Sequence, residues 1–337
     1  MMDINKLSKF DVTHLNEHTV TINKLYSKCK TTTYEQLDEY ERKRMTSHFM
    51  DSEVIEYIKE HMCCKSVYTF NKVNVTIYMC DSSEYEYDVE EWIILNIVMT
   101  IILTFNVCGK NVEHTELNVI YIDVDISKHL EPECVKTEIN SGSTTVATGD
   151  ITIWRRDELH RTLIHEIIHS LNLDLKGTDI SEYFSHQINI PFNFNEAYTE
   201  FITIHIYAIW CAFMNDSMVD DELKRLIATS IRQTDVLIKH LNSDSLKCTL
   251  QNSNVMSYMY LKTLFVSDRK MYKLMSSLVK QHANNKHTDD KHIIDNIVRL
   301  VKLKFEKIVK LIKQRDGTQL PQRANYVFYD VKSLHHQ

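Results

Sequence analysis

The scarcity of chain-breaking residues constrains the fold of this sequence more than any other feature. Its 337 residues include only five glycines and three prolines. Sandwiches and barrels need many tight turns, and glycine and proline supply most of the backbone conformations of such turns. The sequence therefore favours long helices. Its length and 43% hydrophobic content suffice for one large core or for two lobes with a cleft between them.

Strand-like patterns are confined to the N-terminal half. Apolar residues alternate with smaller or polar ones in residues 73–79 (VNVTIYM), which is typical of a half-buried strand. The run SVYTF precedes it across Asn71 and Lys72, so we expect a hairpin. Short β-branched runs follow at residues 117–124, 135–139 and 149–154. Together these runs predict one mixed sheet.

Helical patterns make up most of the remaining sequence. A polar, helix-prone stretch covers residues 33–62, and Asp157 is a suitable N-cap for the first helix of the C-terminal half. The later helical segments lie at residues 157–173, 195–214, 219–241, 253–282 and 288–313. The most apolar segment, residues 92–105, is shorter than the roughly 20 residues that span a bilayer, so we interpret it as a buried core helix rather than a transmembrane segment.

These patterns predict an α+β, mainly helical protein with three regions. Residues 1–64 form an N-terminal helical region, and residues 65–175 form a lobe with the mixed β-sheet. Residues 176–337 form a helical lobe, and we expect an active-site cleft between the two lobes. Residues 174–194 separate the helical segments at 157–173 and 195–214, and no shape is predicted for them.

Charge and cysteine content argue against several classes of function. The net charge of −7 comes from 39 basic and 46 acidic residues, so no domain-wide basic surface indicates a nucleic-acid partner. The N-terminus lacks the apolar stretch of a signal peptide, and the eight cysteines form no CxxC pair, which favours an intracellular protein with reduced thiols. The Lys-rich stretch at 298–315 is interpreted as a docked helix with a solvated face, with an anionic membrane or a partner as the alternative.

One segment carries a metal-binding pattern. His165-Glu166-Ile167-Ile168-His169 lies in a run whose apolar residues recur at helical spacing. Residues four apart stand one turn above each other on a helix, so both imidazoles can reach one metal ion while Glu166 lies beside them, toward a bound water. Composition alone produces such a motif in roughly 6% of chains of this kind.

A second acidic motif follows downstream. Asn195-Glu196-Ala197-Tyr198-Thr199-Glu200 places Glu196 27 positions after His169, at the start of another apolar, helix-periodic segment. Glu196 and Glu200 are four residues apart and share one helix face. Their alternative role is that of a solvated acidic face.

HEIIH followed by NEAYTE resembles the gluzincin (thermolysin-like) zinc metallopeptidases, whose third ligand comes from a downstream NExxx(D/E) motif. The resemblance implies one Zn²⁺ held by His165, His169 and Glu196, with Glu166 as general base and acid. It also implies that Glu200 accepts a hydrogen bond from His165, which fixes the tautomer of that ligand. The order NSG, strand, HExxH helix and LD over residues 117–214 is similar to metallopeptidases of large eukaryotic DNA viruses.

The resemblance points to two further elements of the site. The segment Asn140, Ser141 and Gly142 precedes the strand that leads to the HExxH helix, where gluzincins keep an edge strand that pairs with extended substrate. An ordinary polar turn is the alternative. Gluzincins also use a Tyr or His to stabilise the oxyanion, and Tyr258 is the candidate here, with Tyr260, His205 and His240 as rivals. Tyr258 could equally be a packed core residue.

We therefore expect a zinc-dependent endopeptidase, acting on a protein or peptide substrate in the host cytoplasm, or in the virion if the protein is viral. One alternative is a catalytically inactive metallopeptidase-like scaffold or virion interaction protein. Another is hydrolysis of a different amide. Cleavage specificity and oligomeric state have no signature in the sequence.

Overall fold

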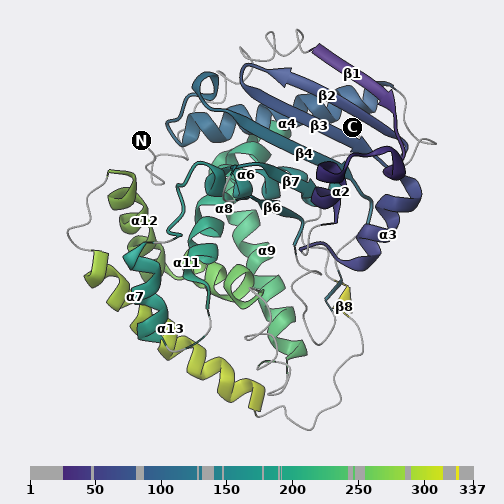
Figure 1. The fold of residues 1–337 in the computed structure, drawn as a ribbon. Helices are drawn as coiled ribbons and strands as arrows, with labels where there is room; N and C mark the ends of the chain where they lie inside the picture. Colours follow the sequence, from purple (N-terminus) through teal and green to yellow (C-terminus); the bar gives the residue numbers. More distant parts are fainter. Residues whose placement is uncertain are drawn as a thin grey trace. The chain divides into compact units, whose positions relative to one another are not determined.

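The computed structural model describes residues 26–46, 49–80, 87–126, 129–130, 140–145, 148–176, 178–188, 190, 192–241, 246, 255–284, 290–313 and 324–325. They form two compact units (Figure 1). The sheet unit comprises the described residues up to 126 and from 140 to 171, and the helical unit comprises residues 129–130 and 172–325. The protein is mainly helical with a mixed sheet, which confirms the predicted α+β class.

The sheet unit is built on a mixed sheet with the strand order β1-β2-β3-β4-β7-β6. The strands are β1 (Tyr26–Thr31), β2 (Cys64–Phe70), β3 (Val73–Met79), β4 (Leu117–Asp123), β6 (Gly142–Thr144) and β7 (Ile151–Trp154). β1, β2 and β3 pair antiparallel, β3, β4 and β7 pair parallel, and β6 runs antiparallel to β7. The predicted hairpin turns at Asn71, whose φ of +51° is a left-handed value that asparagine tolerates. Because β6 is the last strand in the sheet order, it is an edge strand, as expected.

Helices cover both faces of this sheet (Figure 1). On one face, α2 (Glu39–Met45) and α3 (Ser52–His61) contribute Met45, Val54 and Ile58 to a buried cluster with Tyr78, Ile122 and Trp154 of the strands. The alternate strand residues Ile77, Tyr121 and Ile153 are also fully buried, so they face the other side. There α6 (Leu159–Ser170) packs against α4 (Tyr87–Val107), β6 and β7. α4 makes the crossover between the parallel strands β3 and β4.

The helical unit is organised around one buried helix, α8 (Phe194–Asn215). The other helices are α7 (Asp179–Ile188), α9 (Val219–His240), the π-helical segment η5 (Met256–Leu261), α11 (Lys262–Ser267), α12 (Arg269–Ala283) and α13 (Asp290–Lys313). α8 packs against α9, η5 and α11, while α13 packs against α7 and α12. Two short strands, β5 (His129–Leu130) and β8 (Ala324–Asn325), pair antiparallel.

Among the described residues, two helices are long and apolar enough to cross a membrane by length and composition: Glu90–Val107 of α4 and Phe194–Asn215 of α8. Within the protein, 72% of the first window and 89% of the second are buried. Such burial is typical of core helices, which pass the same test of length and composition. α4 has 21 residues, so it is longer than the apolar run from which it was predicted.

The helix boundaries differ from the sequence expectation at three places. Residues 174–194 contain α7, and the segment expected at 253–282 is divided at Asp268, whose side chain caps α12. α6 begins at Leu159 after a short 3-10 turn, so Asp157 is not its N-cap. The strand β1 had no predicted counterpart, and the run expected at 135–139 lies outside the described residues.

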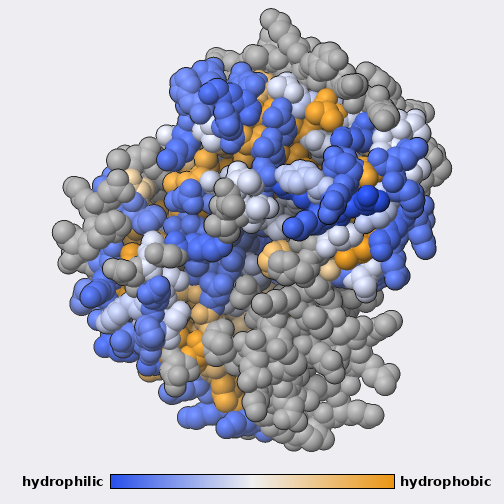
Figure 2. All heavy atoms as spheres, in the orientation of Figure 1, coloured by the Kyte–Doolittle hydropathy of each residue, from blue (hydrophilic) through white to orange (hydrophobic). Residues whose placement is uncertain are grey.

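On the face shown in Figure 2, the described surface is largely hydrophilic, with hydrophobic residues in scattered patches. The Lys-rich helix α13 illustrates this arrangement. Its apolar residues Ile297, Val301 and Ile312 are fully buried, while Leu303 is 53% exposed among the charged side chains. α13 is therefore docked on its unit through its apolar face, as expected.

Candidate metal centre

A strained turn sets the direction in which α6 leaves the sheet. Arg155, directly after β7, has a φ of +103°, which residues with a side chain rarely adopt. Its guanidinium donates to the Ile126 carbonyl oxygen at 2.8 Å and to the Asp51 carboxylate at 3.3 Å. Arg155 is itself buried. These contacts offset the backbone strain and hold the start of the HExxH helix against the sheet.

The helical spacing places the two histidines of the motif on one face of α6. Ile164, Ile167 and Ile168 are fully buried and anchor the helix in the core. His165 and His169 lie one turn apart, and their Nε2 atoms approach to 2.9 Å. An imidazole nitrogen binds a metal through its lone pair, so this convergence is what two ligands of a single cation require.

Glu166 lies beside the histidines and is held by strand β6. It is 7% exposed, and its Oε2 accepts a hydrogen bond from the Thr144 hydroxyl at 2.6 Å. The same hydroxyl lies 3.1 Å from the Glu166 carbonyl oxygen. Thr144 therefore fixes the orientation of the carboxylate and leaves Oε1 for another donor.

The close approach of β6 to α6 requires glycine at position 142. A Cβ atom at Gly142 would lie 2.5 Å from Thr162 Cγ2 and 3.1 Å from Glu166 Cγ. The predicted substrate-binding residue Asn140 is partly buried and lies two residues before the strand. Ser141 is buried, its hydroxyl donates to the Glu158 carboxylate, and its carbonyl oxygen accepts from Trp154 N. The hydroxyl and the carbonyl oxygen of Ser141 are thus used within the sheet unit.

The acidic motif forms the first turns of α8 in the helical unit. Asn193 caps the helix, and its side chain accepts from Glu196 N at 3.2 Å. Asn195 accepts from Leu175 N at 2.6 Å, which ties the start of α8 to the preceding segment. Glu196 is partly exposed and Glu200 is 2% exposed. The predicted hydrogen bond between Glu200 and His165 stays a prediction.

Tyr258 contacts the third predicted ligand. Its hydroxyl donates to Glu196 Oε2 at 3.0 Å, and its side chain is only partly buried, unlike a core tyrosine. Among its rivals, Tyr260 is 2% exposed and packs against Phe192 and Phe305.

His205, another rival, is buried and bonded to Phe201 O and to the Tyr272 hydroxyl. Burial lowers its pKa to about 4. The side chain of His240, the last rival, lies outside the described residues. Of the candidates with described side chains, Tyr258 is the one in contact with Glu196.

The ligand atoms of His165, His169 and Glu196 lie within 4.8 Å of one another, so the three residues form a candidate metal-binding triad. The donor set is two imidazole nitrogens and one carboxylate oxygen. This set suits a transition-metal ion better than calcium or magnesium, which prefer oxygen ligands.

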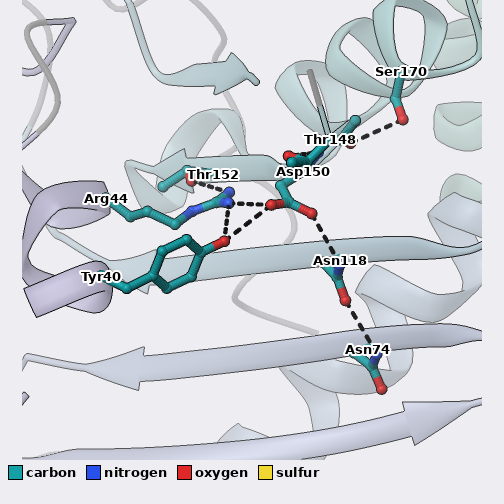
Figure 3. A network of polar contacts seen from close by, with 9 residues as sticks. Tyr40, Arg44, Asn74, Asn118, Thr148, Asp150, Thr152 and Ser170 are labelled. Carbon is teal, nitrogen blue, oxygen red and sulfur yellow. Dashed lines mark hydrogen bonds and ion pairs between the residues drawn. The ribbon is translucent and has the colours of Figure 1, made fainter. Parts of the chain in front are cut away.

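A polar network supports the turn between β6 and β7 (Figure 3). Arg44 and Tyr40 of α2 bind Asp150 Oδ2 at 2.6 and 3.0 Å, and Asn118 of β4 binds Oδ1 at 2.9 Å. From the other side, the Ser170 hydroxyl at the end of α6 donates to Gly149 O at 2.9 Å. Burial would raise the pKa of Asp150, but the hydrogen bonds from its neighbours and the charge of Arg44 hold it below its usual value. The network thus ties the β7 end of this turn to α2, β4 and α6.

Sequence reasoning missed several of these supporting residues, namely Thr144, Arg44, Asp150 and Ser170. The alternation of β6 was the one available signal, because it places Thr144 on the same face as Gly142. The partners of Asp150 come from distant parts of the chain and leave no local pattern.

Comparisons with known proteins add one similarity. No family model matches the chain. No solved structure matches it either. The chain is similar to an uncharacterized protein of Acanthamoeba polyphaga mimivirus, with 27% identity over 135 residues. The match covers 37% of this chain and 34% of the mimivirus protein. The chain is thus similar to a viral protein over about a third of either length.

Proposed function

We propose that the protein is a zinc-dependent peptidase of the gluzincin kind, with His165, His169 and Glu196 as zinc ligands. The observation that carries the proposal is the convergence of the two Nε2 atoms at 2.9 Å, with the ligand atoms of all three residues within 4.8 Å. Two histidines and one glutamate are a known ligand set of catalytic zinc sites, and three protein ligands leave one position open. The similarity to a mimivirus protein agrees with the resemblance to viral metallopeptidases.

Zinc in such a site polarises a carbonyl group and lowers the pKa of water to about 7. The protein supplies the proton transfers. Glu166 Oε2 is engaged by Thr144, so Oε1 is the oxygen that takes a proton from the attacking water. A C–O bond forms at the substrate carbonyl, the C–N bond breaks, and Glu166 passes the same proton to the departing amine. The residue ends the cycle as a carboxylate, ready for the next turnover.

Strand β6 offers a docking edge for an extended substrate. Trp154 N donates to Ser141 O and Thr145 N donates to Asp150 O, so the two residues that flank β6 bond inward, toward β7 and the residue before it. In an antiparallel ladder the alternate residues, Gly142 and Thr144, then turn their backbone N–H and C=O groups to the open edge. A peptide that added there as a further strand would lie next to Glu166, because Thr144 donates to its carboxylate and a Cβ atom at Gly142 would lie 3.1 Å from its Cγ.

The proposal is tested by a cleavage assay of the full chain against a peptide library, with and without a chelator. We expect cleavage that the chelator abolishes and added Zn²⁺ restores. A protein that holds one zinc ion per chain but cleaves no peptide would instead be a metal-binding scaffold. A protein that neither binds zinc nor cleaves peptides would refute the proposal as a whole.

A further inference from the structure

The π-helical segment η5 has an uncommon geometry and carries Tyr258. A run of i→i+5 hydrogen bonds is rare and is frequently found at functional sites. In η5 it covers Met256–Leu261, within the helical unit, and leads directly into α11. Such a segment calls for a reason beyond packing, because regular α-helix would bury the same apolar residues with better hydrogen-bond geometry.

Two successive residues of η5 contact the first turn of α8. The Ser257 hydroxyl accepts a hydrogen bond at 2.8 Å from the backbone N–H of Asn193, the residue that directly precedes α8. Tyr258 donates to Glu196 Oε2 at 3.0 Å. Asn193 in turn caps α8 by accepting from Glu196 N at 3.2 Å. η5 therefore contacts both the cap residue of α8 and the carboxylate of Glu196.

The contact with Glu196 bears on how that carboxylate can bind a metal. A free glutamate side chain has several rotatable bonds, and fixing them costs conformational entropy. A hydrogen bond at Oε2 restricts these rotations before any cation arrives. It thereby limits the directions in which the Glu196 carboxylate can present an oxygen atom to a cation.

We propose that Tyr258 is a positioning residue for the third metal ligand, held in place by the π-helical geometry of η5. This inference rests on the proposed function, because it takes Glu196 to be a zinc ligand. It differs from the role of oxyanion donor expected from the resemblance. A ligand-positioning hydroxyl acts on metal affinity, whereas an oxyanion donor acts on turnover and leaves metal affinity unchanged.

Tyr258→Phe separates these roles, because it removes the hydroxyl and keeps the ring. Tyr260→Phe is the matched control, since Tyr260 lies two residues along in η5 and its hydroxyl has no hydrogen-bond partner among the described residues. Zinc affinity is measured on full chains by competition with a chromophoric chelator, and the absorption spectrum of the Co²⁺ form reports the ligand geometry. Thermal unfolding of the metal-free chains tests whether both variants fold.

We expect Tyr258→Phe to weaken zinc binding by about 10- to 100-fold and to change the Co²⁺ spectrum, with Tyr260→Phe like the parent. Zinc affinity of Tyr258→Phe within twofold of the parent would overturn the inference while leaving the proposed function intact. A parent chain that binds no zinc would refute the proposed function, and with it this inference. If Tyr258→Phe does not fold, Ser257→Ala tests the placement of η5 against the first turn of α8: weaker zinc binding supports the inference and unchanged binding refutes it.

Discussion

The packing of Gly142 against the HExxH helix leads to a prediction whose size can be worked out from the structure. A Cβ atom at position 142 would lie 2.5 Å from Thr162 Cγ2, whereas carbon atoms in contact sit about 3.5–4.0 Å apart. Gly142→Ala therefore pushes β6 away from α6 by about 1 Å. Overpacking of this kind costs about 1–3 kcal/mol, which corresponds to a fall in Tm of roughly 2–10 °C.

The same shift acts on catalysis through Thr144. Its hydroxyl lies on the same face of β6 and donates to Glu166 Oε2 at 2.6 Å, so a displacement of about 1 Å stretches this bond beyond hydrogen-bond range. A misplacement of that size can cost about 100-fold in turnover. Zinc content should stay at the parent level, because neither histidine contacts the new methyl group among the nearest atoms.

Thermal unfolding, zinc stoichiometry and peptide turnover are measured on Gly142→Ala, Thr162→Ser and the double variant. Thr162→Ser deletes the atom nearest to the new methyl group, and the next contact, with Glu166 Cγ, is 3.1 Å. The double variant should therefore recover most of the lost stability, as a non-additive pair. Ser143→Ala is the control, because its side chain points to the opposite face of β6. A Gly142→Ala variant with the Tm and turnover of the parent would refute the described packing of β6 on α6.

Three further predictions concern the residues around the site. Thr144→Val keeps the shape of the side chain without its hydroxyl, so we expect parent-level zinc and a turnover lowered about 10-fold or more; unchanged turnover would deny Thr144 its role in orienting Glu166. Glu200→Ala should weaken zinc binding by roughly 10- to 100-fold in chelator competition without unfolding the protein, and unchanged affinity would assign Glu200 a purely structural role. Asp150 has a pKa below its unfolded value, so its contribution to stability is present above about pH 4 and is lost as the pH falls further. The difference in unfolding free energy between the parent and Asp150→Asn should accordingly shrink between pH 5 and pH 2, and a constant difference would contradict this account.

The sequence predicted those strands and helices whose apolar residues recur at a regular spacing over a few residues. The alternation in residues 73–79 gives β3, and the apolar repeat around His165 gives α6, because each pattern is set by neighbours within a few residues. The acidic motif likewise lies at the start of α8, where it was expected. The helical repeat indicates which side chains share a helix face. The prediction that His165 and His169 lie close together is therefore confirmed.

The parts that the sequence did not predict depend on contacts between distant residues. Arg44 and Asp150 are 106 positions apart, and Tyr258 and Glu196 are 62 apart. Neither pair leaves a trace in a window of the length over which periodicity is read. The π-helical geometry of η5 is similarly invisible, because its apolar residues recur much as they would in an α-helix.

Two helix boundaries differ from the predicted ones because of interactions of nearby side chains and backbone. Asp268 offers a carboxylate to two backbone N–H groups of α12, and this capping competes with continuation of the preceding helix. Before α6, the left-handed φ of Arg155 and the 3-10 turn after it displace the helix start to Leu159. Neither effect follows from hydrophobic pattern alone.

The central claim is that His165, His169 and Glu196 hold zinc while Glu166 transfers the proton. The most direct test is to measure zinc stoichiometry and peptide turnover together on the parent, Glu196→Ala and Glu166→Gln. The account predicts one zinc ion per chain in the parent and in Glu166→Gln, a loss of at least about 100-fold in turnover for Glu166→Gln, and loss of both zinc and turnover in Glu196→Ala. Full zinc in Glu196→Ala, or cleavage by Glu166→Gln at the rate of the parent, would contradict it.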